Sequence, residues 1–403
     1  MRILYFTQLF CPENIAAAFR AKDHSDIWSD LGHDVTVFTG WPNYPTGRLF
    51  DGYDIVPLRE ERIGRVRVFR SASKIQPNTS FKKRIESGIS FILGGLNNLR
   101  SGSPVGSNYD VVLVTSGTVF SAWLGVHYAK KHRLPLVVEF RDLTYKQMMA
   151  TGSKGVKAAA MKALELSFCR VADRVVVLTD GFKKDLVAEG VSPEMISVVP
   201  NGADVVPCEH QWHHSLRLGY FGTMGLSQNV PETVEYAKHL AEKGLVSSYE
   251  LVGEGAARAE LEQMMDTDKL GFLGLQRGIP MSELEARYAR VDMTVVSLKK
   301  SEQFAGTIPS KIFQSFARGV PVLYIGPVGD ASRLIEESGA GIVLSGSRDE
   351  DLLALDEFAA QPDLAEKLSK MSASAIDFME RNYTRKRMAD QMLVSLANAA
   401  KSH

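Results

Sequence analysis

The segment 295–326, VVSLKKSEQFAGTIPSKIFQSFARGVPVLYIG, constrains the fold more than any other part of the chain. The apolar residues 294–296 predict a strand, and 322–325 predict a second one. Between them Pro309 opens a helix at a position where its missing N–H costs nothing, and Gly319 ends that helix. The pattern predicts a strand–loop–helix–strand unit of an open α/β sheet, in which ligands bind at the carboxyl ends of the strands.

Ser310 and Lys311 lie in the first turn of this expected helix. Free backbone amides and the helix dipole favour an anion there, and a hydroxyl and a cation strengthen the attraction. A lysine is electrostatically unfavourable in a first turn, and an anionic ligand would explain its presence. The residues therefore predict a diphosphate site, whereas the plainer interpretation is an ordinary helix start with a solvated lysine.

The composition fits a globular protein of two domains. The 403 residues exceed what one hydrophobic core usually organises, and a formal net charge of zero gives no support to an overall polyanion-binding role. The three cysteines are far apart and indicate a reduced, intracellular compartment. The first residues predict a strand rather than a signal peptide, and the uncharged run 111–129 predicts a buried strand and helix rather than a membrane span.

In the first half, expected strands alternate with helices. Apolar runs predict strands at 3–7, 35–39, 66–69, 136–140, 174–178 and 196–199, and a strand and helix within 111–131. Residues 8–14 lack the G-x-G-x-x-G fingerprint, which argues against a nicotinamide cofactor. The proline-rich loop 41–47 follows a strand, where loops often carry function. Arg141 and Asp142 also follow a strand, so they are candidates for the ligand cleft, although an internal ion pair is the alternative.

One region of the first half is strongly basic. Residues 59–84 contain nine Lys or Arg against two acidic residues, and the expected helix 81–100 carries Lys82, Lys83 and Arg84 beside apolar residues. A basic amphipathic segment of this kind is typical of attachment to a membrane surface. Packing of its apolar side on the sheet is an equally good interpretation, and the two are compatible.

The second half begins after the turn residues 200–202 (PNG) and the polar run 209–215, which together predict a domain boundary. Glycines follow expected strands at 216–221, 248–252 and 270–273, and a glycine there lets a ligand approach the backbone closely. The domains are then 1–203, which would bind the acceptor, and 204–375, which would bind the donor. Helices at about 363–380 and 385–401 end the chain, and the segment 376–403 is expected to brace both domains.

With these elements in place, the second half resembles glycosyltransferase family 4, the retaining nucleotide-sugar transferases with the GT-B fold. The matching motifs are 197–204 (SVVPNGAD), 220–225 (YFGTMG), 251–255 (LVGEG), 271–274 (GFLG) and 316–322 (FARGVPV). The chain is also similar to the branch that builds bacterial O-antigen and capsule, through 39–47 (TGWPNYPTG) and 140–143 (FRDL) in the first half and 309–311 (PSK) in the second. Within that branch the chain resembles transferases that add N-acetyl-L-fucosamine to a polyprenyl-diphosphate-linked sugar.

The chain departs from the family pattern at the donor site. Family 4 usually has two glutamates separated by seven residues, and Gly306 and Gln314 stand in their places here. Gln314 can still bond a hydroxyl, but Gly306 cannot do the work of a carboxylate. The usual Arg and Lys after the first strand of the second domain are replaced by Thr223 and Gln228. The diphosphate charge would then fall to Lys311, Ser310 and the helix amides.

The resemblance implies a metal-independent retaining glycosyltransferase that works in a cleft between two Rossmann-like domains. It implies a UDP-sugar donor and no other cofactor, and a place on the cytoplasmic face of the inner membrane. The departing phosphate oxygen would take the acceptor proton, so no protein base is required. The implied donor residues are Gly222, Thr223, Gly253, Glu254, Phe272, Ser310, Lys311 and Gln314, and Asp142, Arg141 and Glu13 would orient the acceptor.

Two other functions fit the same residues. A nucleotide-sugar 2-epimerase has this fold, but it would need acid/base carboxylates where Gly306 and Gln314 stand. A non-catalytic protein that binds nucleotide-sugar and regulates a membrane assembly complex would tolerate the loss of both glutamates. Turnover of donor in the presence of a lipid-linked acceptor would distinguish an enzyme from such a partner.

Overall fold

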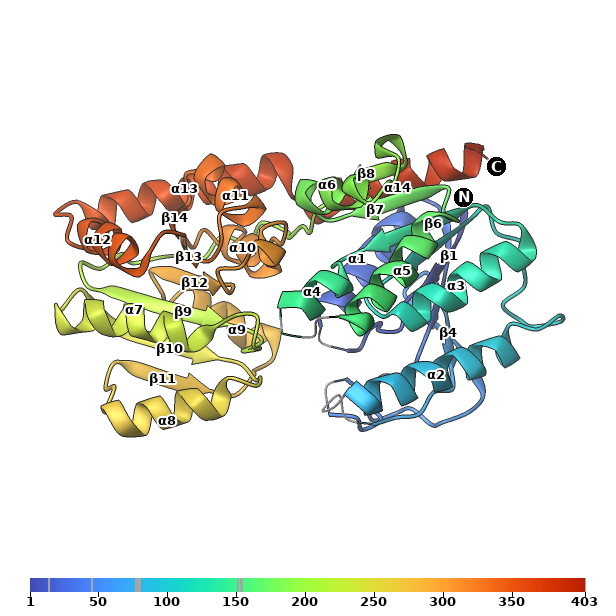
Figure 1. Ribbon diagram of the computed structural model, residues 1–403, viewed down its shortest axis with the longest axis horizontal. Coiled ribbons are helices and arrows are strands. Elements are labelled where there is room, and N and C mark those ends of the chain that lie inside the picture. The colour runs from blue at the N-terminus through green and yellow to red at the C-terminus, as the bar shows by residue number, and fades with distance from the viewer. Residues whose placement is uncertain (14, 45, 77–80, 151, 153–154, 403) are drawn as a thin grey trace. The chain divides into compact units, whose positions relative to one another are not determined.

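The computed structural model describes residues 1–402 except 14, 45, 77–80, 151 and 153–154 (Figure 1). Contacts divide the chain into two compact units. The first combines Met1–Tyr145, Gly155–Asn201 and Arg385–His403, and the second combines Lys146–Lys154 and Gly202–Thr384. The chain passes into the second unit two residues before the expected boundary at 203, and the expected segment 376–403 is divided between the units.

A largely parallel sheet forms the centre of the first unit. Its strand order is β3 (Leu58–Ile63), β4 (Val66–Ser71), β2 (Asp34–Thr39), β1 (Arg2–Phe6), β5 (Val111–Thr115), β6 (Leu136–Phe140), β7 (Arg174–Val177) and β8 (Ile196–Val198). Among the described strands of this sheet, only β3 and β4 pair antiparallel. The direction of strand addition reverses between β1 and β5, which makes the carboxyl ends of these two strands the topological switch point.

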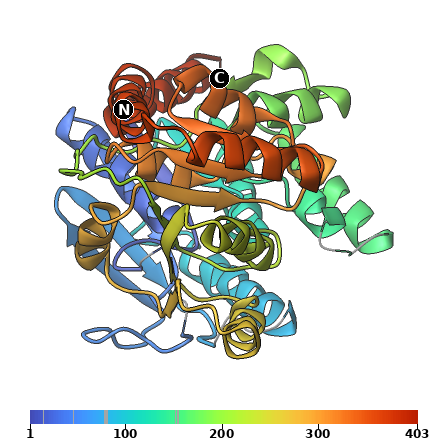
Figure 2. The same ribbon diagram turned by 90° about the vertical axis from the view of Figure 1, so that its left-hand side faces the viewer.

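Helices cover both faces of this sheet, because successive side chains of a strand point to opposite faces. Tyr5 of β1 contacts Trp28 of α1 (Ala16–Asp30), and the next residue, Phe6, contacts Tyr128 of α3 (Val119–His132). Helix α14 (Arg385–Ser402) packs beside α1, and α2 (Phe81–Asn98) packs beside α3 (Figures 1 and 2). The remaining helices are α4 (Thr144–Ala150), α5 (Val156–Cys169), α6 (Asp180–Ala188) and the 3-10 turn η1 (Pro193–Met195).

The second unit has a parallel sheet of its own. The strand order is β11 (Leu273–Gln276), β10 (Val246–Val252), β9 (Leu216–Phe221), β12 (Met293–Ser297), β13 (Val322–Ile325) and β14 (Gly341–Leu344). In chain order this is 3-2-1-4-5-6, the order of dinucleotide-binding doubly wound sheets. Its switch point lies between β9 and β12.

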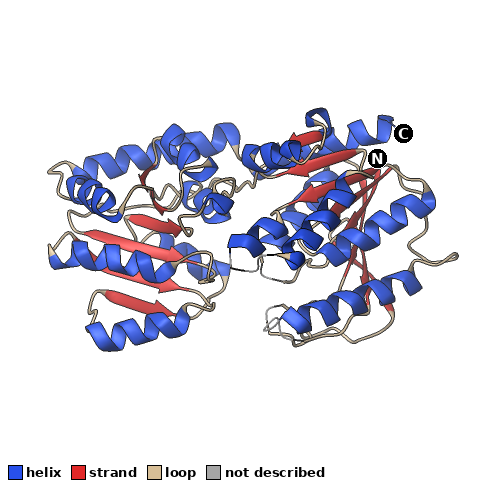
Figure 3. Ribbon diagram, viewed as in Figure 1, coloured by secondary structure: helices blue, strands red, loops and turns tan. Residues whose placement is uncertain are grey.

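Helices also flank the second sheet, as Figure 3 shows for each unit. Helices α7 (Val230–Glu242) and α12 (Arg348–Ala359) pack together, and α13 (Leu364–Asn382) packs on α10 (Ser310–Phe316) and α11 (Asp330–Ser338). The other elements are α8 (Arg258–Asp268), α9 (Met281–Tyr288) and the 3-10 turn η2 (Glu302–Phe304). The prediction of an α/β fold with two Rossmann-like domains is confirmed.

Two strands differ from the sequence prediction. Strand β3 has the sequence LREERI and was not expected, because its charged side chains pair with neighbours on an edge strand, as in the Arg67–Glu60 ion pair of 2.7 Å. Strand β11 begins three residues later than the predicted strand 270–273, because Leu273 is the residue in register with Tyr249. The uncharged run 111–129 divides into β5 and the start of α3 as predicted, and no helix in the described residues is long and apolar enough to cross a membrane.

Candidate functional site

Glycines form the carboxyl edge of the second sheet beside its switch point. Gly222 follows β9 and Gly253 follows β10, and the N–H of Gly222 donates to the carbonyl of Val252 at 2.8 Å. A Cβ atom on Gly253 would lie 1.9 Å from the carbonyl oxygen of Gly222, and Gly222 itself has φ 122°. Only glycine fits at either position, since one loop rests directly on the next.

Lys311 of α10 reaches this pair of loops. Its Nζ donates to the carbonyl oxygen of Thr223 at 3.2 Å and lies 3.6 Å from the centre of the Tyr220 ring. A Cβ atom on Gly222 would lie 2.9 Å from Lys311 Cε, so the missing side chain leaves room for the lysine. Burial lowers the pKa of Lys311 well below its usual value. No ion pair joins Lys311 to a carboxylate in the described part of the chain.

Gln314 lies one turn further along α10. Its Oε1 accepts a hydrogen bond from Arg318 Nη1 at 3.0 Å, which fixes the amide and leaves its nitrogen as the group able to bond a ligand. Arg318 is 7% exposed, and its guanidinium carbon lies 4.7 Å from the centre of the Tyr288 ring. Sequence reasoning missed this arginine, because the motif FARGVPV indicates only the end of a helix.

The remaining predicted donor residues divide into two groups. Glu254 is exposed directly after Gly253, and its carbonyl accepts from the N–H of Met224, so it joins the two glycine loops. Phe272 precedes β11, whose first residue pairs with Tyr249 in the middle of β10. At the carboxyl edge Gln276 is the partner of Val252 instead. The structure thus brings Gly222, Thr223, Gly253, Glu254 and Lys311 together and leaves Phe272 several residues from that edge.

In the first unit, the predicted residue Glu13 is a buried structural carboxylate. The N–H groups of Asn43 and Tyr44 donate to its Oε1 at 3.0 and 2.9 Å, and the N–H of Phe10 donates to its Oε2 at 3.2 Å. The side chain is 2% exposed, and burial raises its pKa although these bonds oppose the change. Glu13 therefore holds the described part of the loop that follows β2.

Arg141 and Asp142 follow β6 as expected. Arg141 is half-buried and donates from Nη2 to the carbonyl of Ala16 at 3.1 Å, and burial lowers its pKa while Glu139 opposes that change. Asp142 is exposed. Glu139, two residues before Arg141, is fully buried, and its Oε1 pairs with Arg20 Nε at 2.8 Å. Sequence reasoning missed this ion pair, because its members are 119 residues apart.

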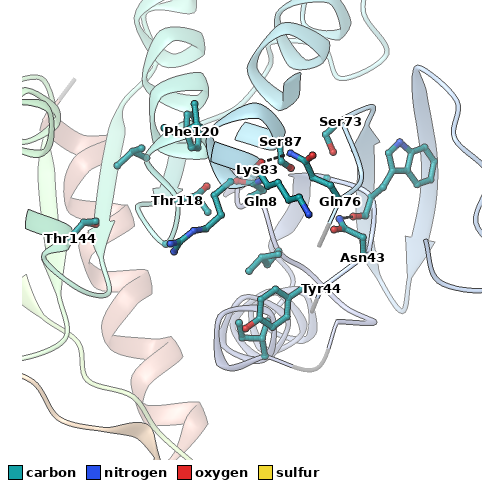
Figure 4. Close-up of a pocket in the computed structure, with 18 of the residues that line it drawn as sticks. Gln8, Asn43, Tyr44, Ser73, Gln76, Lys83, Ser87, Thr118, Phe120 and Thr144 are labelled. Atoms are coloured by element: carbon teal, nitrogen blue, oxygen red, sulfur yellow. Dashed lines mark hydrogen bonds between the residues drawn. The ribbon is translucent and has the colours of Figure 1, made fainter. Parts of the chain in front are cut away.

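A pocket of about 570 Å³ lies at the switch point of the first sheet (Figure 4). Its walls come from the loops after β1, β2 and β5, from the first turns of α2 and α3, and from α5. Figure 4 shows Gln8, Asn43, Lys83 and Thr118 around it. The lining residues do not include Glu13, Arg141 or Asp142. Sequence reasoning found the loop 41–47 but not the pocket, which needs segments distant in the chain.

The described residues contain no assembled site for a metal ion. No group of three or more His, Cys, Asp or Glu side chains is arranged there to hold a metal ion. The independence from metal expected from the sequence remains a prediction.

Residues 18–202 match the family described as Glycosyl transferase 4-like domain, and no curated protein sequence matches the chain. The fold is similar to that of sucrose-phosphate synthase from Thermosynechococcus elongatus, at 14% identity and a TM-score of 0.73 over 100% of both chains. It is similar to WaaG, a glycosyltransferase involved in lipopolysaccharide biosynthesis, at 14% identity and a TM-score of 0.68 over 98% of this chain and 99% of that one. It is also similar to HepE of Anabaena, solved in complex with UDP, at 14% identity and a TM-score of 0.67 over 98% of this chain and 100% of that one. These likenesses confirm the GT-B fold.

Proposed function

We propose that this chain, whose residues 18–202 match the family described as Glycosyl transferase 4-like domain, is a retaining glycosyltransferase that moves a sugar from a UDP-sugar to a polyprenyl-diphosphate-linked sugar. The resemblance found in the sequence favours N-acetyl-L-fucosamine as the sugar, and O-antigen or capsule as the product. Support comes from the HepE structure with UDP and from the stated role of WaaG. The single observation that carries the proposal is the Lys311 ammonium against the glycine loop after β9.

The donor diphosphate is the group that the second unit stabilises. Negative charge grows on this group as the anomeric bond breaks, so a fixed cation beside it lowers the barrier. Lys311 is that cation. Burial lowers its pKa, and an anion beside it stabilises the charged ammonium and so raises the pKa again. Gly222 and Gly253 let the donor approach the backbone closely, and the amide nitrogen of Gln314 binds the ribose.

The acceptor hydroxyl attacks on the face from which the diphosphate leaves, and the departing phosphate oxygen takes its proton. Arg141 and Asp142 orient the acceptor at the carboxyl end of β6. Glu13 acts indirectly, since its carboxylate holds the backbone of Asn43 and Tyr44.

Helix α2 attaches the protein peripherally to the cytoplasmic face of the inner membrane, where a lipid-linked acceptor resides. Ile89 and Leu93 are 48% and 63% exposed and lie one turn apart on the same side of α2. The ion pairs Arg67–Glu60 and Arg70–Glu61 neutralise part of the basic segment 59–100. Attachment therefore depends more on the exposed apolar face of α2 than on the strands β3 and β4.

The proposed function is tested by incubating the purified chain with a panel of UDP-sugars and a polyprenyl-diphosphate-linked sugar, with and without EDTA. We expect transfer from UDP-N-acetyl-L-fucosamine, an anomeric configuration retained in the product, and no loss of rate in EDTA. Binding of UDP-sugar without transfer to any acceptor would indicate a non-catalytic partner instead. Isomerisation of the donor in the absence of acceptor would indicate an epimerase.

A further inference from the structure

Tyr220, near the end of β9, carries the aromatic ring against which the Lys311 ammonium lies. The tyrosine is 0% exposed and belongs to the hydrophobic core of the second unit, together with Met224, Val234 and Tyr249. Close packing in a protein core holds a side chain in one rotamer. The ring is therefore a rigid support for the end of a long, flexible side chain.

The first contact joins the ring to the ammonium. Lys311 Nζ lies 3.6 Å from the centre of the Tyr220 ring. A cation within about 6 Å of a ring centre is attracted by the negative ring face, and the attraction is stronger where water is excluded. Since no carboxylate pairs with Lys311 in the described part of the chain, the ring supplies a favourable electrostatic contact that an ion pair would otherwise give. Burial lowers the pKa of Lys311, and the ring opposes this change because it favours the charged form.

The second contact depends on the Tyr220 hydroxyl. This hydroxyl donates to the carbonyl oxygen of Thr223 at 2.6 Å, and Lys311 Nζ donates to the same oxygen at 3.2 Å. A carbonyl oxygen has two lone pairs, so it can accept both bonds. Burial raises the pKa of Tyr220 well above its usual value, which keeps the hydroxyl protonated and able to donate. One side chain thus fixes both groups that the ammonium contacts.

Gly222 lies between these two groups and leaves room for the lysine. A Cβ atom on Gly222 would lie 2.9 Å from Lys311 Cε and 3.5 Å from Nζ. The ring, the open position and the carbonyl therefore come from one short segment at the end of β9, whereas the cation comes from α10. This segment determines where the ammonium lies relative to the glycine loop.

We propose that Tyr220 is a positioning residue for Lys311: its ring holds the ammonium, and its hydroxyl fixes the carbonyl that the ammonium contacts. The role of Lys311 at the donor diphosphate rests on the proposed function, whereas the role of Tyr220 rests on these contacts. Because Tyr220 is fully buried, it acts on the donor through Lys311. A cation that is already in place needs no rearrangement as charge develops, so the effect should be larger on kcat than on donor affinity.

The test measures the affinity of the intact chain for UDP by calorimetry over a range of pH. Affinity should fall as pH rises through the pKa of Lys311, because a neutral amine does not attract the diphosphate. Tyr220→Leu removes the ring and lowers that pKa further, so the midpoint of the fall should move to lower pH by about one unit. The ionisation of UDP is the same for every variant, so the difference between midpoints reports on Lys311. An unchanged midpoint in folded Tyr220→Leu would overturn the role of the ring.

Tyr220→Phe separates the hydroxyl from the ring. It keeps the ring, so the midpoint should stay near that of the natural protein, while kcat falls about two- to tenfold through the lost bond to Thr223. In Tyr220→Leu, kcat should fall about ten- to a hundredfold, because both contacts are lost.

Tyr249 provides the matched controls. It is a fully buried tyrosine of the same core, on the neighbouring strand β10, and its hydroxyl is hydrogen-bonded to that of Thr233 at 2.8 Å. Tyr249→Phe and Tyr249→Leu should leave the midpoint and kcat near their natural values. Equal changes in the Tyr220 and Tyr249 variants would mean that Tyr220 serves only the packing of the core, and would overturn the proposal.

A variant that keeps the shape of the ring gives a result even if Tyr220→Leu does not fold. Trifluorophenylalanine, incorporated at position 220 through a suppressed stop codon, is compared with Tyr220→Phe. Fluorine withdraws negative charge from the ring face with little change in size, so it weakens the attraction for a cation. We expect the fluorinated protein to lose UDP affinity at lower pH than Tyr220→Phe. The same midpoint in both would overturn the role of the ring.

Turnover separates this inference from the proposed function. If the chain transfers sugar from a UDP-sugar and Tyr220→Leu keeps the natural kcat and midpoint, the role of Tyr220 is wrong and the function stands. If Tyr220→Leu moves the midpoint of UDP binding but no UDP-sugar is turned over, the role of Tyr220 stands and the proposed function is wrong. If the natural protein does not bind UDP, both are wrong.

Discussion

At the carboxyl edge of the first sheet, buried glutamates hold the loops, whereas at the same edge of the second sheet glycines let one loop rest on the next. Glu13 binds the backbone of Asn43 and Tyr44, and Glu165 accepts from the N–H groups of Thr144 and Tyr145 at 2.9 and 3.3 Å. In the second unit the corresponding contact is backbone to backbone, between Gly222 and Gly253.

The two edges also differ in how they treat charge. Glu139 pairs with Arg20, whose remaining nitrogens donate to the carbonyls of Val199 and Pro200 at 2.9 and 2.6 Å. Lys311, in contrast, contacts a carbonyl and a ring, and no carboxylate pairs with it in the described residues. A glutamate near the end of a strand can therefore be structural, whereas a half-buried cation without a counter-charge indicates a ligand.

The largest expected effect is on the free energy of unfolding, through the ion pair at the carboxyl edge of the first sheet. Glu139→Ala would leave the Arg20 guanidinium buried without its counter-charge, and breaking a buried pair costs about 3–5 kcal/mol. Glu60→Ala is the control, because its pair with Arg67 is exposed and contributes about 0–1 kcal/mol. Urea unfolding of both variants measures the difference. Similar losses in the two would mean that the buried pair does not hold this edge.

The next largest effect is expected on the rate of catalysis, at the carboxyl edge of the second sheet. Lys311→Ala removes the cation beside the departing diphosphate, and one such contact is typically worth about 2.7–4 kcal/mol, or roughly a hundred- to a thousandfold in rate. Because the contact strengthens as charge develops, kcat should fall more than donor affinity. Steady-state kinetics of a folded variant checks this. Near-normal turnover would place the diphosphate elsewhere.

A smaller effect is expected from the glycine contact. Gly253→Ala adds a Cβ atom 1.9 Å from the carbonyl oxygen of Gly222, so the backbone must move, at about 1–3 kcal/mol. Gly274→Ala is the control, since nothing lies within 4 Å of a Cβ atom at that position. Thermal unfolding of the two proteins should differ by several degrees. If both unfold at the same temperature, the loops do not depend on this approach.

The smallest of these changes concerns the membrane. Leu93→Ala removes an exposed apolar side chain from α2 and should weaken co-sedimentation with anionic vesicles by about 1 kcal/mol, or roughly fivefold. Leu353→Ala is matched in exposure, 61% against 63%, and lies on α12 of the second unit. Equal loss in both variants would show that α2 is not the attachment surface.

Much of the fold was predictable because it depends on local patterns. The strands 136–140 and 216–221 coincide with β6 and β9, since each is a mostly apolar run, broken only by Glu139 in the first and by Arg217 and Gly219 in the second. Strand β3 was not predictable, because its charged side chains have their ion-pair partners on β4, and the pairing appears only when the two strands lie side by side. For β11 the sequence LGFLGLQ allows two strand positions, and packing on β10 decides between them.

The candidate site divides in the same way. Gly222, Gly253 and Lys311 could be predicted, because each directly follows a strand or opens a helix. The pocket of the first unit could not, since Gln8, Trp41, Lys83 and Thr118 come from separate segments. The sequence offered Lys83 and Arg84 only as part of a basic helix. Their position beside the carboxyl ends of β1 and β5 follows from the packing of α2 on α3.

The measurement that tests the role of Lys311 most directly is proton uptake on binding UDP. Burial lowers the pKa of Lys311, so as pH rises through that lowered pKa part of the ligand-free protein comes to carry a neutral amine. A diphosphate beside it favours the charged form, so binding should take up protons, and affinity should fall as pH rises through the lowered pKa. Calorimetric titrations in two buffers of different ionisation enthalpy measure the uptake. We predict uptake in the natural protein and none in Lys311→Ala, and equal uptake in both would contradict the account.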